Sequence, residues 1–134
     1  MSPSGSTRPE ARPDPPADAP ADGDAARIVL VTCPDVGAAE GLARALVEAR
    51  LAACVQLLPG LVSVYRWRGA LERADEVALL VKTVVHRVAA VEAHIAASHP
   101  YEVPEILVLA PASAGAAYAA WLAAECAPTA APAP

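Results

Sequence analysis

The sequence predicts an α+β fold in which a four-stranded antiparallel sheet carries two helices on one face. The first observation is the order of the patterned segments, which reads strand, helix, strand, strand, helix, strand, followed by a short helix. The second is the turn at Gly69-Ala70, which joins the two longest extended segments into a β-hairpin. The third is the length of these two segments, which exceeds that of the outer strands.

The first strand and helix are marked by a change in apolar pattern. Arg27 to Cys33 is a continuous aliphatic run, as expected for a strand covered on both faces. Asp35 can cap the helix that follows, which runs from about Val36 to Arg50 with apolar residues at helical spacing.

The hairpin comprises Val55 to Arg68 and a partner strand ending near Thr83, and Pro59-Gly60 interrupts its first arm once. Alternation places Leu61, Ser63, Tyr65 and Trp67 on one face of that arm, and Val62, Val64, Arg66 and Arg68 on the other. At roughly 13 residues and ~3.3 Å per residue, each arm would reach ~43 Å, about twice a typical strand.

The remaining elements complete a ferredoxin-like βαββαβ sandwich with an added C-terminal helix. A second helix is expected from His86 to Ser98, because Pro100 bars its extension. Val103 to Leu109 is predicted as a last long strand, and the final helix, ending near Glu125, carries the aromatic residues Tyr118 and Trp121.

The long hairpin also predicts self-association. Its distal part extends past the outer strands and would leave backbone groups and apolar side chains uncovered. Such edges are normally paired or covered. We therefore expect other copies of the same chain to cover them, which makes a homo-oligomer.

The domain is expected to span residues 27–126, between two tails. Residues 1–26 are rich in proline, alanine and aspartate, and residues 127–134 contain mainly alanine and proline. Such segments cannot bury enough apolar surface to offset the entropy of ordering, so both tails are predicted to be disordered.

Composition limits the partners and the compartment. The net charge of −5 argues against a nucleic-acid partner, which requires a basic face. The three cysteines show no C-x-x-C pair, which favours reduced thiols. The N-terminus has no apolar h-region of a signal peptide, and no apolar run approaches the ~18 residues of a membrane span, so a cytoplasmic protein without a membrane partner is predicted.

Several motifs in the same order resemble the CutA divalent-cation tolerance family. They are Leu51-Ala-Ala-Cys54, Pro59-Gly60-Leu-Val-Ser63-Val-Tyr65-Arg-Trp67-Arg-Gly69, Leu80-Val-Lys82-Thr83 and His99-Pro100-Tyr101-Glu-Val-Pro104-Glu105-Ile106. The resemblance covers about Ile28 to Glu125. It implies a homotrimer similar to the PII signalling proteins and a role in the response to divalent metals such as copper. It implies no established enzymatic reaction and no required cofactor.

Three residues are candidate metal ligands. His99 lies in a loop, where an imidazole can present a lone pair, and the family motif has a histidine there. The resemblance implies that in some members the copper site joins this histidine to another histidine just before it and to a cysteine of the first strand. In this sequence Ser98 and Val31 occupy those two positions. Cys33 lies on the same face as Val31 and could substitute. Cys54 could bind Cu(I) as a thiolate, although core packing is the simpler role for it.

A second set of residues suggests a cleft or a subunit interface. Aromatic residues with a polar group are favoured where a ring is buried and its OH or NH is satisfied. The set either stabilises the trimer or selects a small polar ligand between subunits. Its members are Tyr65, Trp67, Lys82, Tyr101 and Glu105.

Other proteins with the βαββαβ order are excluded by their chemistry. An RNA-recognition domain stacks bases on aromatic residues of its central strands, whereas the first strand here is Ile-Val-Leu-Val. An acylphosphatase-like enzyme needs an asparagine, and this sequence has none. Two hypotheses remain: a divalent-cation tolerance trimer that binds metal weakly, and a PII-like signalling or scaffold trimer that binds a metabolite or a protein.

Overall fold

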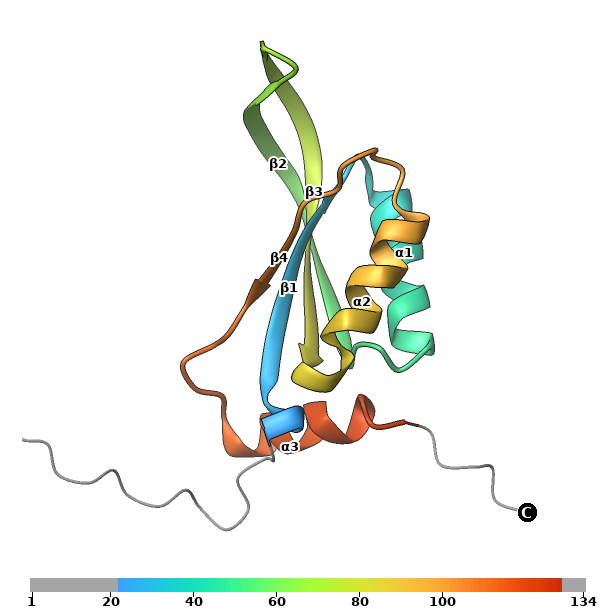
Figure 1. Ribbon diagram of the computed structural model, residues 1–134, viewed down its shortest axis with the longest axis vertical. Helices are drawn as coiled ribbons and strands as arrows, with labels where there is room; N and C mark the ends of the chain where they lie inside the picture. Colours follow the sequence, from blue (N-terminus) through green and yellow to red (C-terminus); the bar gives the residue numbers. More distant parts are fainter. Residues whose placement is uncertain (1–21, 129–134) are drawn as a thin grey trace, which may run out of the picture.

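Four antiparallel strands form one sheet, and two helices cover one of its faces (Figure 1). The computed structural model describes residues 22–128. In chain order the elements are η2 (Asp22–Asp24), β1 (Ala26–Cys33), α1 (Val36–Glu48), β2 (Cys54–Trp67), β3 (Ala70–Val84), α2 (Val85–Ser98), β4 (Ile106–Leu109) and α3 (Ala116–Glu125). The strand order β2-β3-β1-β4 and the βαββαβ succession confirm the predicted α+β class. Within the described range, no helix combines the length and apolar character needed to cross a membrane.

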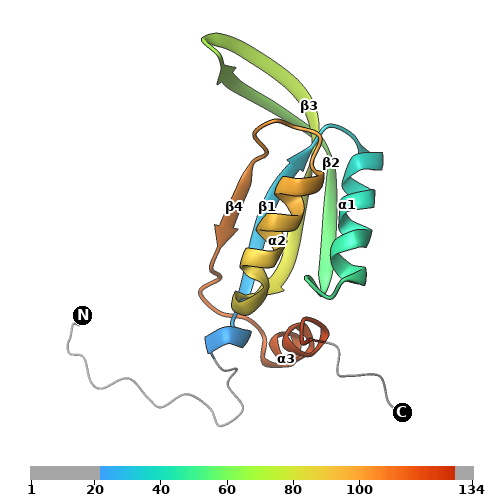
Figure 2. The same ribbon diagram turned by 45° about the vertical axis from the view of Figure 1, so that its right-hand side comes forward.

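The core lies between the sheet and the helices α1 and α2 (Figures 1 and 2). Alternate residues of β1 and β3 point toward the helices, and the period of two is visible in their burial. Burying one such aliphatic side chain contributes about 1.5–3 kcal/mol. The buried residues that these two strands contribute to the main core are Val29, Val31, Cys33, Val77, Leu79 and Val81.

Helix α1 begins and ends through local hydrogen bonds. The carboxylate of Asp35 accepts a bond of 2.8 Å from the N–H of Ala38, which confirms the predicted cap. The helix ends at Glu48 instead of Arg50. Arg50 has a left-handed φ of 59°, and its N–H bonds to the carbonyl of Val47, a way of ending a helix that satisfies its last carbonyls.

The hairpin of β2 and β3 extends beyond the rest of the sheet (Figure 1). Its turn has positive φ at Arg68 (50°) and Gly69 (83°), as a two-residue type I′ turn requires. β3 pairs with β1 only from Val77 to Val84, so Ala70 to Glu76 pair with β2 alone. The predicted projection of the hairpin is therefore confirmed.

The hairpin is irregular at Pro59-Gly60, where the sequence predicts an interruption. The register shifts between Leu58 and Leu61, and Gly60 has a φ of 81°. Beyond this bulge the apolar side chains are uncovered: Val64 is 66% and Leu71 73% exposed. The projecting half therefore presents apolar surface that this single chain does not cover.

Two further boundaries differ from those predicted. The last strand was expected to be long, from Val103 to Leu109, but β4 has only 4 residues, Ile106–Leu109. It pairs with β1 over Ile28 to Val31, and Pro104 lacks the N–H that would extend the ladder. Order also begins before Arg27, because residues 22–24 form the η2 turn and Ala26 pairs with Val84. Residues 1–21 and 129–134 of the expected tails lie outside the described part of the chain.

Helix α3 closes the end of the sheet opposite the hairpin turn (Figures 1 and 2). Leu122 and Cys126 pack on Val84 in a second, smaller core. The side chains of Arg50 and Arg87 donate hydrogen bonds to the carbonyls of Glu125 and Cys126, at 3.2 and 2.8 Å. Cationic donors at a helix C-terminus stabilise it through its macrodipole.

The contribution of the Asp35 cap to the stability of α1 can be tested directly. Asp35→Ala should lower the free energy of unfolding by about 1 kcal/mol, because the N–H of Ala38 loses its acceptor. Urea denaturation measures the change. Asp35→Asn, which keeps a capping oxygen, serves as the matched control. Equal stability of the alanine and asparagine variants would contradict the assignment of the cap.

Candidate functional site

His99 is placed by the end of α2. Its backbone N–H bonds to the carbonyl of Ile95 at 2.9 Å, and its ψ of 140° turns the chain out of the helix. Pro100 follows and cannot continue the helical hydrogen bonds. The imidazole therefore lies where α2 ends, over the last residues of β1.

Both ring nitrogens of His99 have hydrogen-bond partners. Nδ1 accepts a bond of 3.0 Å from the backbone N–H of Tyr101. Because Nδ1 accepts, the proton of a neutral ring is on Nε2. Nε2 lies 2.7 Å from the carbonyl oxygen of Thr32, to which it donates, and 3.7 Å from Sγ of Cys33.

Tyr101 links His99 to the root of the hairpin. Its ring is tilted on the imidazole, with 4.8 Å between the centroids. Its hydroxyl donates a bond of 2.6 Å to Oε2 of Glu76, a carboxylate that is only 8% exposed. Burial and then this hydrogen bond raise the pKa of Tyr101 well above its usual value. Glu76 directly precedes Val77, the last partner of β1, so the contact closes over the point where the hairpin leaves β1.

The thiol of Cys33 is buried and protonated. Cys33 is 1% exposed, and burial, followed by the charges of Asp35 and Glu76, raises its pKa to about 11. A thiolate is the form that binds metals. The carboxylates around Cys33 therefore oppose its ionisation in the absence of a cation.

A hollow of about 360 Å³ lies beside this pair, between α1 and α2. It is bounded on α1 by small residues, among them Gly37, Ala38 and Gly41, and by Cys33 and His99 from below. His94 and Ser98 line the same hollow from α2. Both Cys33 and His99 therefore border this hollow.

A metal ion fits this site only after a rearrangement. Cys33 and His99 supply one sulfur and one nitrogen within reach of each other, a combination suited to soft ions. Both nitrogens of His99 are engaged, however, and the thiol retains its proton. Among residues 22–128, no group of three or more His, Cys, Asp or Glu side chains is placed to hold a metal ion.

Cys54, the third predicted ligand, is not brought to this pair within one chain. It begins β2 and pairs with Lys82, whereas Cys33 pairs with Val77 on the other side of β3. Two inter-strand spacings and five residues along β3 separate the two cysteines by about 10 Å across and about 16 Å along the sheet. The two cysteines also lie on opposite faces of the sheet. Cys33 belongs to the core, whereas in β2 it is Val55 that packs against the core, so its neighbour Cys54 points to the other face.

The five cleft residues do not converge within a single chain either. Tyr65 and Trp67 are 43% and 40% exposed on the hairpin, and the guanidinium of Arg68 lies 5.2 Å from the Trp67 ring centroid. Lys82 donates to Oε1 of Gln56 at 2.8 Å, about 20 Å along β3 from Glu76. Glu105 is exposed just before β4.

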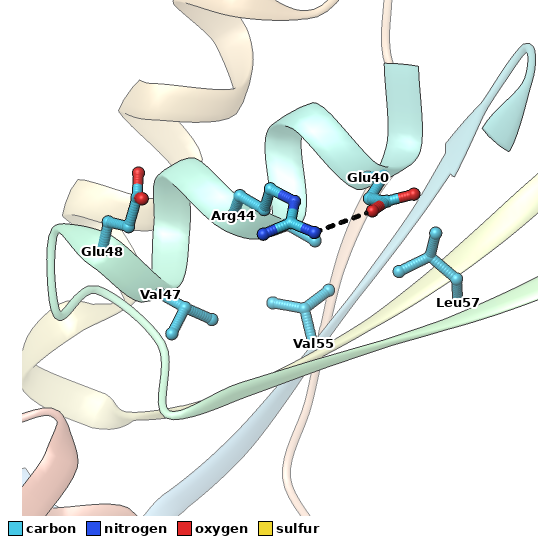
Figure 3. A pocket seen from close by; sticks show the side chains of 7 residues that line it. Glu40, Arg44, Val47, Glu48, Val55 and Leu57 are labelled. Atoms are coloured by element: carbon cyan, nitrogen blue, oxygen red, sulfur yellow. Dashed lines mark hydrogen bonds and ion pairs between the residues drawn. The ribbon is translucent and has the colours of Figure 1, made fainter. Parts of the chain in front are cut away.

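A second hollow, of about 450 Å³, lies between α1 and the edge strand β2 (Figure 3). Val47, Val55 and Leu57 line its apolar part, and the ion pair of Arg44 and Glu40, 3.1 Å apart, lies at its rim. None of the predicted site residues lines it. It is open and carries no convergent set of reactive groups.

Sequence reasoning missed two groups of this site, namely the carbonyl of Thr32, which bonds to His99, and Glu76, which bonds to Tyr101. A backbone carbonyl leaves no signal in a sequence. Glu76 does leave one, because it is an acidic residue directly before the buried run of Val77 to Val81 and lies on the face of β3 opposite the helices. A buried carboxylate requires a partner, and Tyr101 is that partner.

The fold and the site together define a ferredoxin-like protein with a projecting hairpin and an imidazole-thiol pair at its root. The family model of the CutA1 divalent ion tolerance protein matches residues 27–125. The divalent-cation tolerance protein CutA of Thermus thermophilus is 46% identical over 95 residues, covering 71% of this chain and 92% of that protein. The chain therefore belongs to the CutA1 divalent ion tolerance family.

Solved structures show the same fold. CutA from Xylella fastidiosa aligns with a TM-score of 0.74 at 40% identity, covering 76% of this chain and 98% of that one. The protein described as the periplasmic divalent cation tolerance protein CutA from Archaeoglobus fulgidus aligns with a TM-score of 0.74 at 30% identity, covering 76% of this chain and 99% of that one. The predicted ferredoxin-like class and family are thus confirmed.

The raised pKa of Cys33 predicts a loss of stability at alkaline pH. The thiol has a pKa of about 11 in the folded chain, above the 9.0 of a free thiol, so the folded state retains the proton longer than the unfolded state. The contribution of the protonated Cys33 thiol to the free energy of unfolding is complete below pH 9.0 and is lost as the pH rises toward about 11. Urea denaturation across this window should show a steeper decline for the wild type than for Cys33→Ala. Parallel curves would contradict the assignment.

Proposed function

We propose that this protein contributes to divalent-cation tolerance as a homotrimer and binds copper, or another divalent cation, weakly at His99 and Cys33. The observation that carries the metal part is the distance of 3.7 Å between Nε2 of His99 and Sγ of Cys33. An imidazole and a thiol at this separation are a suitable pair of donors for a soft ion. The names of the relatives, which describe divalent-cation tolerance, support the biological role.

The hairpin supports self-association. Its projecting half lacks β1 as a neighbour and exposes Val64 and Leu71, while the short β4 leaves a second free edge. Proteins normally cover edges and apolar surfaces of this kind. Three copies around one axis would bury the hairpins and bring Tyr65, Trp67, Lys82, Tyr101 and Glu105 to the boundaries between subunits.

Two donors make a weak site, so further ligands are expected to come from elsewhere. Cys54 is half-buried at the start of β2, on the sheet face opposite the helices, and would join a metal only through another copy. We therefore assign no required cofactor. We also assign no catalytic activity, because the family is defined by cation tolerance and not by a reaction.

A cytoplasmic location is part of the proposal. The cysteines at 33, 54 and 126 are all free thiols, as is usual in a reducing compartment. The archaeal relative described as periplasmic makes this a point to be tested by fractionation.

A second candidate function is a PII-like signalling or scaffold trimer that binds a small metabolite or a protein in its clefts. It is favoured by the engagement of both nitrogens of His99, which leaves no lone pair free for a metal. Metal effects would then be indirect. A titration with copper separates the two functions.

Light scattering tests the assembly. The particle mass should be about three times the 13.6 kDa chain mass at micromolar concentration. Val64→Asp should dissociate the trimer. Burying each valine in the interface would contribute about 1.5–3 kcal/mol, and a carboxylate there would lose this contribution. Val36→Asp, at an exposed position on α1, is the control and should remain assembled. A stable wild-type monomer would refute the trimer.

Calorimetric titration with copper tests the metal site. Wild type should bind copper with a Kd below about 1 mM. His99→Ala and Cys33→Ala should each weaken binding at least about tenfold, because each variant removes one of only two protein donors. His86→Ala, a histidine of the opposite end of α2, should bind like the wild type. Binding weaker than about 1 mM, or no loss in His99→Ala, favours the signalling function instead.

A further inference from the structure

The loop from His99 to Glu105, called here the 99–105 loop, belongs to both candidate sites. Its first residue is the candidate metal ligand His99, and its third is Tyr101 of the cleft set. The two residues are joined by the bond from the Tyr101 backbone N–H to Nδ1 of His99. Metal binding at His99 or movement of Tyr101 would therefore affect this shared hydrogen bond.

We propose that the 99–105 loop is an autoinhibitory latch, in which Tyr101 withholds His99 from metal ions. The inference rests on the proposed metal binding at His99. It adds a conformational step to that binding, namely the release of Tyr101.

Direct coordination through Nδ1 requires release of Tyr101. The lone pair of Nδ1 is the acceptor for the Tyr101 N–H at 3.0 Å. A lone pair cannot bind a cation and accept this hydrogen bond along the same direction. An ion at Nδ1 thus displaces the Tyr101 backbone.

Coordination through Nε2 has the same consequence by a longer route. Nε2 faces Cys33 and the hollow between α1 and α2, but it carries the proton donated to the Thr32 carbonyl. To expose a lone pair at Nε2, a neutral ring must carry its proton on Nδ1. Nδ1–H would then point at the N–H of Tyr101, and two donors cannot share one bond. Either nitrogen of His99 therefore becomes available only when Tyr101 moves.

Glu76 holds the latch closed. The Tyr101 hydroxyl donates to its buried carboxylate at 2.6 Å, and hydrogen bonds to charged acceptors are among the stronger ones. The other link from this loop to the hairpin, between Glu102 and Arg68 at 2.8 Å, is largely exposed and therefore contributes little. Tyr101 and Glu76 thus form the main link between the loop and β3.

Because coupling between two sites is reciprocal, release of Tyr101 should favour metal binding as much as metal binding favours release. Removing the hydroxyl of Tyr101 leaves every candidate metal ligand in place, loosens the latch and takes this donor from the Glu76 carboxylate. Tyr101→Phe should therefore bind metal more tightly by about tenfold or more, the range expected for one hydrogen bond to a charged group. Tyr118→Phe, on the exposed face of α3, is the matched control and should bind like the wild type.

NMR on the full chain tests the latch itself. In metal-free protein, the ring nitrogens of His99 should report the Nε2–H tautomer, and the Tyr101 amide should exchange slowly with solvent. Titration with Zn²⁺, which is diamagnetic, should abolish the protection of that amide in step with the shift of the His99 ring signals. Calorimetry of the same variants with Zn²⁺ supplies the affinities.

The outcomes separate this inference from the proposed function. Zn²⁺ bound at His99 while the Tyr101 amide stays protected, or an Nδ1–H tautomer in the free protein, would overturn the latch and leave metal binding intact. Binding by Tyr101→Phe that exceeds that of the wild type, together with loss of amide protection, supports the latch. Absence of binding by both proteins would overturn the direct metal site and the latch together.

Discussion

The unequal pairing of β3 determines the arrangement of this protein. β3 is hydrogen-bonded to β2 along nearly its whole length, but to β1 only from Val77 to Val84. The part shared with β1 carries the helices and the core. The remaining part has strand partners on one side only and exposes apolar residues. The boundary between the two parts, at Glu76 and Val77, is also where Tyr101 of the 99–105 loop bonds to β3.

The period of the apolar residues was sufficient to predict the type and order of the elements. The continuous run of β1, the capped helix at Asp35 and the turn at Gly69 each depend on short-range chemistry, so the sequence alone located them. The length of β4 depends on how far β1 offers a partner, which is a tertiary property. The segment from Val103 to Leu109 was therefore predicted to be a longer strand than the one that forms.

The site was predictable in its members but not in its hydrogen bonds. His99 was singled out because a loop imidazole normally has a free lone pair, and Cys33 because it shares a strand face with Val31. The sequence could not show that the Tyr101 backbone turns back onto Nδ1, since that depends on the path of the loop. It also could not show that Cys54 and Lys82 lie far from this point, because their separation arises from strand register.

Helix α3 has a consequence for how the molecule can be joined to others. Its C-terminal carbonyls accept hydrogen bonds from Arg50 and Arg87. The helix lies at the end of the sheet where β1 begins (Figure 2). Residues 22 and 128, where the described chain begins and ends, therefore lie at the end of the sheet remote from the hairpin turn. A fluorescent protein or affinity tag fused beyond either residue would extend away from both the hairpin and His99. The molecule thus has one end suited to attachment, remote from the projecting hairpin.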